Sequence, residues 1–180
     1  MANHVTNTIE IEYDRADKKT EEILERLVNL RANEEELSVL YENPQNTRTW
    51  WENNIGAKWA YVDDWEGPVG GYCRVGIVSA WSQVTEFIEH LNEITEFSCD
   101  ITHQYLDETP NFGGYAIYEK GTVVSEFDEP DMWDRIEKEA DIRKKEENLV
   151  FEDEYEERDW MWDWMWDFAH DIVDPEVDDV

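Results

Sequence analysis

The stretch that most constrains the fold runs from Trp50 to Trp81. Aromatic and β-branched residues form two runs within it, roughly at 58–63 and 72–80, and a Gly-Pro-Val-Gly-Gly sequence separates them. Two such runs joined by Gly and Pro are typical of a β-hairpin, and tryptophan buries a large apolar surface. The pattern therefore predicts a hairpin inside a hydrophobic core. We expect three of the tryptophans to fill that core: Trp50, Trp59 and Trp81.

Alternating and helical patterns on both sides of this stretch complete the order of elements. An alternation of apolar and polar residues predicts a half-buried strand at 5–13. Residues 14–17 offer the side chains that start a helix ending near 31, and Ser82 is a suitable N-cap for a second amphipathic helix ending near 95. The remaining predicted elements are strands at 58–63, 72–80 and 99–105, and an additional hairpin at 115–118 and 122–127.

The resulting order is βαββαβ followed by a hairpin, which is the split βαβ pattern of a ferredoxin-like sandwich. Residues 37–41 fit either a short strand or one turn of helix, and this choice stays open. The sequence thus predicts an α+β fold in two parts. A ferredoxin-like domain occupies residues 1–130, and an acidic, Trp-rich helical extension occupies residues 131–180.

Acidic residues greatly outnumber basic ones in this chain. The 46 Asp and Glu residues against 15 Lys and Arg give a formal net charge of -31. Because proteins bind DNA, RNA and anionic membranes through Lys and Arg, this balance argues against direct binding to any of them. A basic protein is the natural partner for such a surface.

The two cysteines, Cys73 and Cys99, each fall at an apolar position of a predicted strand. This placement favours buried thiols over a disulfide framework. Residues 1–4 lack the features of a signal peptide, and no apolar run reaches the roughly 18 residues of a membrane span. We therefore expect a protein of the cytoplasm.

Four segments of the chain carry a resemblance to a known family. They are Met1, Asn3, Asn7, Ile9 and Ile11; Trp50, Asn54, Gly56, Lys58 and Trp59; Ser79, Ala80, Trp81 and Ser82; and Tyr105, Asp107, Phe112 and Gly114. In order and spacing they resemble the YubB or Api92-like ferredoxin-like family of phages and plasmids, over residues 1 to about 127. The resemblance implies a ferredoxin-like fold and a phage or plasmid protein that works in a bacterial host. It implies no settled biochemical activity.

The C-terminal extension begins with a predicted helix at 131–147, in which basic residues are interleaved with acids that can pair with them. Beyond this helix the balance changes. From 146 to 180 the chain has fifteen Asp or Glu residues and one basic residue, Arg158. This is the most acidic part of the chain.

Residues 159–173 predict a helix with stripes four residues apart. A strand would instead place the tryptophans on one face, and we prefer the helix because Asp, Met and Ala suit strands poorly. Such a helix is apolar nearly all round, so we expect it to be covered on most sides. Its three adjacent stripes are Asp159, Asp163, Asp167 and Asp171; Trp160, Trp164, Phe168 and Ile172; and Met161, Met165, Ala169 and Val173.

Two interpretations of this helix stay open. In the first, it packs back on the open face of the sheet and completes the core. In the second, it binds a partner or a second copy of the chain, because Trp and Met are enriched at the centre of protein interfaces. Both can hold together.

No catalytic motif stands out in the sequence. The four histidines, His4, His90, His103 and His170, fall on separate predicted elements, and no nucleophile motif, phosphate-binding loop or metal motif accompanies them. We expect His103 to be a hydrogen-bonded core residue. The sequence therefore predicts a protein that is not an enzyme and that has no cofactor or metal.

The acidic extension favours nucleic-acid mimicry. Carboxylates on one face of a helix recur about every 6 Å, which is comparable to the spacing of phosphates along a DNA strand. We expect the protein to inhibit a basic, nucleic-acid-handling host protein, such as a defence nuclease or a transcription factor. The alternative is a structural protein whose Trp-rich helix forms a homodimer, with the acidity serving solubility. The residues expected to bind the partner are Glu152, Asp153, Glu154, Glu156, Glu157, Asp159, Trp162, Asp163, Trp166 and Asp167.

Overall fold

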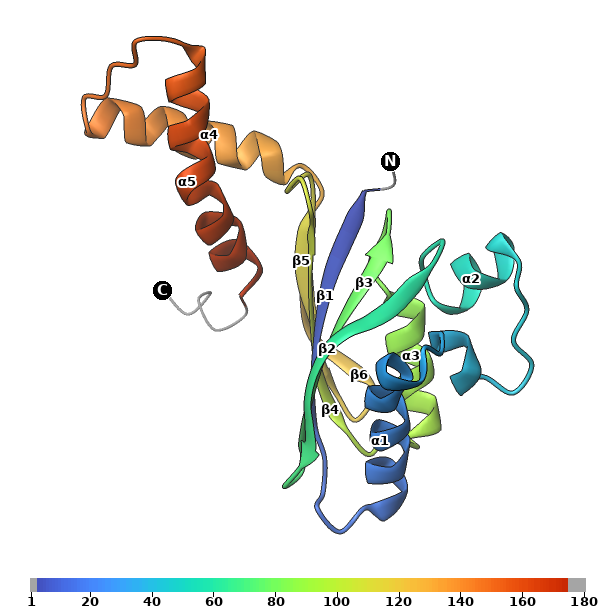
Figure 1. The fold of residues 1–180 in the computed structure, drawn as a ribbon. Helices are drawn as coiled ribbons and strands as arrows, with labels where there is room; N and C mark the ends of the chain where they lie inside the picture. Colours follow the sequence, from blue (N-terminus) through green and yellow to red (C-terminus); the bar gives the residue numbers. More distant parts are fainter. Residues whose placement is uncertain (1–2, 175–180) are drawn as a thin grey trace.

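The computed structural model describes residues 3–174. Its strands form one antiparallel sheet (Figure 1). They are β1 (His4–Glu12), β2 (Ala60–Val69), β3 (Tyr72–Ala80), β4 (Asp100–Asp107), β5 (Gly113–Glu119) and β6 (Thr122–Glu129). Buried and exposed side chains alternate along β1 with the period of two that the sequence predicts.

The strands lie side by side in the order β2-β3-β1-β4-β5-β6. In the first four, β1 pairs with both β3 and β4, which is the arrangement of a ferredoxin-like βαββαβ sandwich. The additional hairpin, β5 and β6, extends the sheet beyond β4. The predicted α+β class and ferredoxin-like architecture are therefore confirmed.

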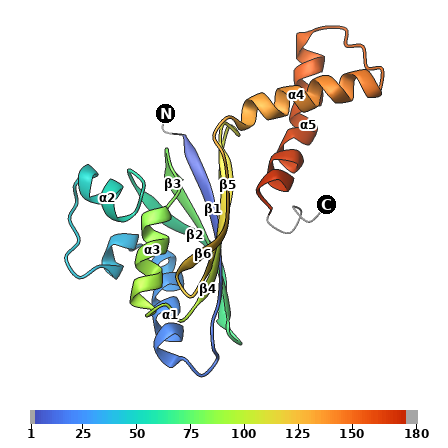
Figure 2. The same ribbon diagram turned by 180° about the vertical axis from the view of Figure 1, so that it is seen from behind.

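The helices are α1 (Lys18–Asn33), α2 (Arg48–Asn54), α3 (Thr85–Ile94), α4 (Met132–Glu146) and α5 (Glu154–Val173), with a 3-10 turn at Leu37–Leu40. This turn resolves the open choice at 37–41 in favour of helix. α1, α2 and α3 lie on one side of the sheet, and α4 and α5 form an arm on the other side (Figures 1 and 2). No helix within residues 3–174 has the length and apolar character needed to cross a bilayer.

The main hydrophobic core lies between the sheet and the helices α1 and α3. Ile9 of β1, Leu27 of α1 and Phe87 of α3 are fully buried in it. Cys73 and Cys99 are buried there as free thiols, as the sequence predicts. Burial raises the pKa of Cys73 to about 12, so this thiol is a packing group and not a reactive one.

A side chain of β1, and not Ser82, holds the start of α3. The Oδ1 atom of Asn7 accepts a hydrogen bond from the backbone N–H of Val84 at 3.1 Å. Ser82 instead donates its hydroxyl to the carbonyl of Gly56, so the prediction that it caps the helix is wrong. His103, which is 1% exposed, also hydrogen-bonds Asn7 Oδ1, through Nε2 at 3.1 Å. This confirms His103 as a hydrogen-bonded core residue.

The tryptophans of the 50–81 stretch do not fill the core as predicted. Trp81 is 45% exposed, because the backbone leaves the strand conformation there with a φ of 73°. Trp50 is half-buried and packs against the main core, so its prediction holds in part, and Trp59 is half-buried. The core tryptophan is Trp51, which is 5% exposed and lies on α2, a helix that the sequence patterns did not predict.

The arm formed by α4 and α5 has a hydrophobic core of its own. α4 leads away from the end of β6, and α5 returns along the side of the sheet opposite α1 and α3 (Figure 1). The predicted helix at 131–147 is thus confirmed as α4, and one side of α5 packs back on the sheet as the first interpretation expects. The arm's core cluster consists of Leu106, Met132, Ile136, Met165, Ala169, Ile172 and Val173. The domain boundary at residue 130 stays a prediction.

Candidate partner-binding surface on the C-terminal helix

α5 begins with a cap built from acidic residues. The Oδ1 atom of Asp153 accepts hydrogen bonds from the backbone N–H groups of Tyr155, at 2.9 Å, and Glu156, at 3.0 Å. In return, Oε2 of Glu156 accepts a hydrogen bond from the N–H of Glu152 at 2.7 Å. The two bonds to Asp153 satisfy N–H groups that the first turn of a helix leaves free, and the bond to Glu156 fixes the residue before the cap. Asp153 and Glu156, both expected to bind a partner, therefore have a local structural role as well.

Glu157 joins the two helices of the arm. Lys144 of α4 donates through Nζ to Oε1 of Glu157 at 2.6 Å, and its Nζ also lies 2.9 Å from Oδ1 of Asp141. The hydrogen bond to Glu157, followed by the one to Asp141, raises the pKa of Lys144 above its ordinary value. The carboxylate of Glu157 is thus engaged inside the arm and is less free than its neighbours to meet a partner.

An aromatic ladder runs along the side of α5 that faces α4. Ring centroids are 5.4 Å apart between Phe151 and Trp160, 5.7 Å between Trp160 and Trp164, and 5.6 Å between Trp164 and Phe168. The guanidinium carbon of Arg143, on α4, lies 4.3 Å from the ring centroid of Trp164. This confirms the aromatic stripe that the four-residue spacing predicts.

The four aspartates form an exposed stripe on the outward side of α5, as predicted: Asp159, Asp163, Asp167 and Asp171. Arg158 lies 3.8 Å from Asp159, and within residues 3–174 this is the one ion pair that involves the stripe. Successive aspartates are about 6 Å apart along the axis, because a helix rises 1.5 Å per residue. The stripe is therefore a row of largely uncompensated negative charges.

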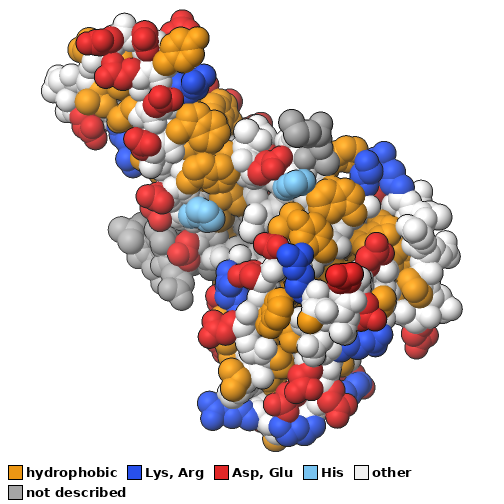
Figure 3. Space-filling view, in the orientation of Figure 1, with side chains coloured by type: hydrophobic (Ala, Val, Ile, Leu, Met, Phe, Trp, Pro, Cys, Tyr) orange, Lys and Arg blue, Asp and Glu red, His pale blue; other side chains and the backbone are white. Residues whose placement is uncertain are grey.

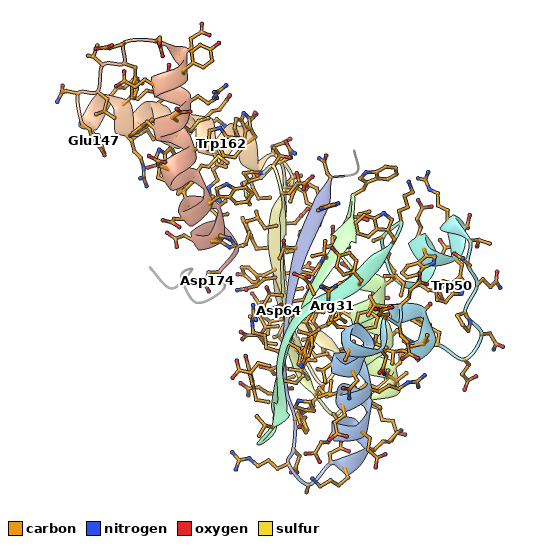
Figure 4. All side chains as sticks on the ribbon, in the orientation of Figure 1. Arg31, Trp50, Asp64, Glu147, Trp162 and Asp174 are labelled. Carbon is orange, nitrogen blue, oxygen red and sulfur yellow. The ribbon has the colours of Figure 1, made fainter. Side chains whose placement is uncertain are left out.

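Two tryptophans border this stripe at one edge. Trp162 is 39% exposed, and Trp166, one turn later, is half-buried against the arm's core cluster. Figure 3 shows hydrophobic side chains gathered along the arm with acidic ones beside them, and Figure 4 labels Trp162 on α5. The expectation that α5 is covered on most sides is wrong. α5 belongs to a projecting arm, and α4 and the sheet cover only one of its sides.

The structure thus divides the ten predicted partner-binding residues into two groups. The outward side of α5 brings together Asp159, Trp162, Asp163, Trp166 and Asp167. The start of the helix holds Glu152, Asp153, Glu154, Glu156 and Glu157, and the side chains of Asp153, Glu156 and Glu157 are engaged in the cap or in the bond to α4. The first group is the better candidate surface, and we call it, with Asp171, the acid–tryptophan surface.

A second cluster of exposed and half-buried aromatic and basic side chains, which was not predicted, lies where β1 and β2 begin and β3 ends. Two cations lie over the ring of Trp81. Lys58 Nζ is 4.4 Å from the ring centroid, and the guanidinium carbon of Arg48 is 5.4 Å from it. His4 and Trp59 contact each other edge to face, with centroids 5.3 Å apart. The contacts of Lys58 and Arg48 stabilise the exposed Trp81 ring by the attraction of cations to aromatic faces. The resemblance includes Lys58, Trp59 and Trp81, but the sequence analysis assigned the two tryptophans to the core and not to a surface cluster.

Neither surface offers a metal centre. Within the part of the chain that the structure describes, no three His, Cys, Asp or Glu side chains are arranged to hold a metal ion. The acidic side chains of α5 point outward along a helix and do not converge on one point. What this arrangement can offer chemically is an extended charged surface with an aromatic edge.

Comparison with known proteins agrees with this architecture. A family model described as the ferredoxin-like domain in Api92-like protein matches residues 56–176, which is more than half of the chain. The chain belongs to this family. The match includes α4 and α5, which we expected to lie outside the resemblance, and it leaves out residues 1–55, which we expected to lie inside it. The arm is therefore part of what the family shares.

A crystal structure of the protein Api92 from Yersinia pseudotuberculosis, another Api92-like protein, is similar to this chain at 19% sequence identity and a TM-score of 0.40. The similar region covers 50% of this chain and 32% of that one, so the chain spans about a third of the length of that family member. No curated protein matches the chain.

Proposed function

We propose that this Api92-like protein is a non-enzymatic binding protein whose acid–tryptophan surface occupies the basic groove of a nucleic-acid-handling protein. One observation carries the proposal. Asp163, Asp167 and Asp171 are exposed and have no ion pair within residues 3–174, and they lie beside the exposed ring of Trp162. A row of unpaired carboxylates next to an aromatic anchor fits a partner that supplies Lys and Arg.

The physical basis is substitution of carboxylates for phosphates. The aspartates of α5 recur about every 6 Å, and a groove that binds DNA or RNA presents cations to charges at a comparable spacing. The net charge of -31 attracts such a groove over a distance of about a Debye length, so association is fast and sensitive to salt. Burial of Trp162 then slows dissociation.

The proposed setting is the cytoplasm of a bacterial host, where a phage or plasmid protein of this kind would inhibit a defence nuclease or a transcription factor. The protein would need no cofactor or metal for this role. It would contact neither nucleic acid nor membrane directly, because its surface repels both. The mobile-element setting rests on the resemblance described above, which implies a phage or plasmid protein.

The experiment compares three forms of the full chain as bait in a bacterial lysate. The first is the wild type. The second carries Asp163→Asn, Asp167→Asn and Asp171→Asn. The third is a matched control that neutralises three exposed glutamates of β1 and α1 with no ion pair to any described residue: Glu12→Gln, Glu22→Gln and Glu25→Gln. The expected result is capture of a DNA- or RNA-binding protein by the wild type and the control, and not by the aspartate variant.

Two further measurements make the result specific. The captured protein should release its nucleic acid when the wild-type chain is added, and the complex should dissociate in about 0.5 M salt, where the Debye length is roughly half its physiological value. Capture that is equal for all three forms would reject the proposal. A dimer of the chain itself that persists in high salt and is lost in Trp162→Ala would favour the homodimer instead.

A further inference from the structure

A hollow lies where the sheet extends beyond its layer of helices. α1 and α3 cover one face of the four ferredoxin-like strands, and the hairpin β5–β6 continues this face past α3 (Figure 2). The hollow between the start of α3 and the strands β4, β5 and β6 has a volume of about 510 Å³. Small-ligand sites commonly measure about 300–1,000 Å³. The side chains that decide its chemistry are Gln83, His103, Tyr105, Tyr118, Glu126 and Asp128.

The strand register explains why these side chains converge. Directly paired residues on neighbouring strands point to the same face of a sheet. Two rows of paired residues cross the three strands: His103, Ala116 and Glu126, followed by Tyr105, Gly114 and Asp128. In the first row the small Ala116 leaves space between the larger side chains, and in the second row the Tyr105 side chain lies over Gly114 and forms part of the floor.

The floor of the hollow is aromatic. Tyr105 and Tyr118 are 7% and 5% exposed. Gly114 allows Tyr105 to lie over β5, because a Cβ atom at residue 114 would come within 2.7 Å of the Tyr105 hydroxyl oxygen. The Tyr105 hydroxyl donates a hydrogen bond to Oδ1 of Asp128 at 2.7 Å. Burial, followed by this bond to Asp128, raises the pKa of Tyr105, so the hydroxyl stays protonated.

His103 adds a fixed hydrogen-bond acceptor to this floor. Oδ1 of Asn7 already accepts from the backbone N–H of Val84, and the Asn7 amide nitrogen donates to Val5, Ile77 and Ser79, so this amide has one orientation. His103 Nε2 must therefore be the donor in its bond to Asn7 Oδ1. The other ring nitrogen, Nδ1, then carries a lone pair and forms no hydrogen bond within residues 3–174.

Burial keeps this imidazole neutral, since it lowers the pKa of His103 to about 3. A neutral imidazole with a protonated Nε2 offers an acceptor through Nδ1 and no positive charge. At the rim, Glu126 and Asp128 of β6 are exposed carboxylates. None of the described side chains that line the hollow is a Lys or an Arg.

We propose that this hollow binds the cationic end of a ligand, an alkylammonium or a guanidinium group. Such a group donates several hydrogen bonds and carries a positive charge that would pair with Glu126 and Asp128, neither of which forms an ion pair within residues 3–174. The rings of Tyr105 and Tyr118 line the hollow, and aromatic rings attract cations. The site lies on the face of the sheet opposite α5. This proposal is therefore independent of the proposed function of the acid–tryptophan surface.

The test measures binding of agmatine and n-butylamine to the full chain by isothermal titration calorimetry, with n-butanol as the neutral analogue of the amine. We expect the amines to bind at one site and n-butanol not to bind. Asp128→Asn should weaken agmatine binding by about tenfold or more, because hydrogen bonds to charged groups contribute most. Tyr105→Phe should weaken it by a few-fold without any change of net charge.

Glu12→Gln is the matched control, because it removes the same charge from the other face of the sheet. Equal losses in Asp128→Asn and Glu12→Gln would show general attraction to an acidic protein and would overturn the proposal, as would equal binding of n-butanol. A second arm uses Nα-acetyl-lysine amide, in which a peptide-like backbone carries the ammonium. Tighter binding of this compound than of n-butylamine would assign the site to a protein side chain, and the reverse order to a free amine.

Discussion

Asn7 of β1 and His103 of β4 share a hydrogen bond of 3.1 Å at the centre of the sheet, and the same Asn7 oxygen holds the first turn of α3. Asn7→Ala would leave His103 Nε2 and the N–H of Val84 buried without an acceptor. Each unsatisfied buried group costs about 1–3 kcal/mol, so we expect the free energy of unfolding to fall by about 3 kcal/mol. Urea denaturation measures this change. Thr6→Ala, at an exposed position of the same strand, should lower it by less than about 1 kcal/mol, and equal losses would contradict the role of Asn7.

The buried imidazole of His103 makes stability depend on pH in a defined direction. Its pKa is 6.5 when the chain is unfolded and about 3 when it is folded, because burial disfavours the charged form. Well above pH 6.5, His103 is neutral in both the folded and the unfolded state, so the full contribution of this residue to the free energy of unfolding is present. As the pH falls from 6.5 towards 3, the unfolded chain takes up the proton first, so stability decreases by about 1.4 kcal/mol per pH unit.

His103→Gln isolates this effect, because a glutamine amide can still donate to Asn7 and does not titrate. Urea denaturation at pH 7, 6 and 5 should give a steeper loss of stability for the wild type than for the variant. Both proteins carry the same carboxylates, including the neighbouring Glu126 and Asp128. Subtracting one curve of unfolding free energy against pH from the other therefore leaves the contribution of His103. Parallel curves would show that folding does not lower the pKa of His103, and they would contradict its burial as a neutral imidazole.

Trp51 and Trp81 have opposite roles in stability although both belong to the tryptophan-rich stretch. Trp51 is 5% exposed and belongs to the main core, whereas Trp81 is 45% exposed and contacts Arg48 and Lys58. We expect Trp51→Ala to lower the free energy of unfolding by about 3–5 kcal/mol and Trp81→Ala by less than about 1 kcal/mol. Denaturation of both variants measures this, and similar losses would contradict the assignment of Trp51 as the core residue.

These two residues also show where sequence reasoning succeeds and where it fails. Alternation along 5–13 predicts the faces of β1 because every residue of that segment keeps a strand conformation. The same reasoning fails at Trp81, where the backbone turns to a positive φ immediately after β3 and the alternation no longer applies. It also misses α2, because adjacent tryptophans at 50 and 51 show no helical period.

Long-range contacts set a second limit. Ser82 has the residue type of an N-cap, and pattern alone favours it. The acceptor that reaches α3 is Asn7, 77 residues earlier in the chain, and only the sheet brings the two together. The hollow at β5 and β6 depends in the same way on strand register, since Glu126 and Asp128 meet His103 and Tyr105 through pairing across three strands.

The stripes of α5 could be predicted because they depend only on a spacing of four residues. The covering of each stripe could not, because it depends on where α4 lies. Contact with α4 covers the aromatic ladder and leaves the aspartate stripe and Trp162 exposed. The acids that cap α5 were likewise indistinguishable from their neighbours in a run where nearly every residue is Asp or Glu.

The packing of α5 on α4 leads to a last prediction, about the arm. Arg143 lies 4.3 Å from the ring centroid of Trp164 and 5.9 Å from that of Phe168, and its Nε donates to Glu139 at 3.1 Å. Arg143→Ala removes both the cation and the stem that cover these rings, so we expect α5 to lose about 1–2 kcal/mol of local stability. Lys145→Ala removes the same charge from an exposed position of the same helix and should change little.

Hydrogen exchange followed by mass spectrometry resolves this loss, because it reports α5 separately from the sheet. The amides of α5 should exchange about 5- to 30-fold faster in Arg143→Ala than in the wild type, while those of β1 and β4 keep their rates. The ratio follows because the arm has its own hydrophobic cluster and can open without unfolding the main core. Equal acceleration throughout the chain would mean that the arm and the sheet unfold as one unit, and that the contact of Leu106 with the arm couples the two clusters.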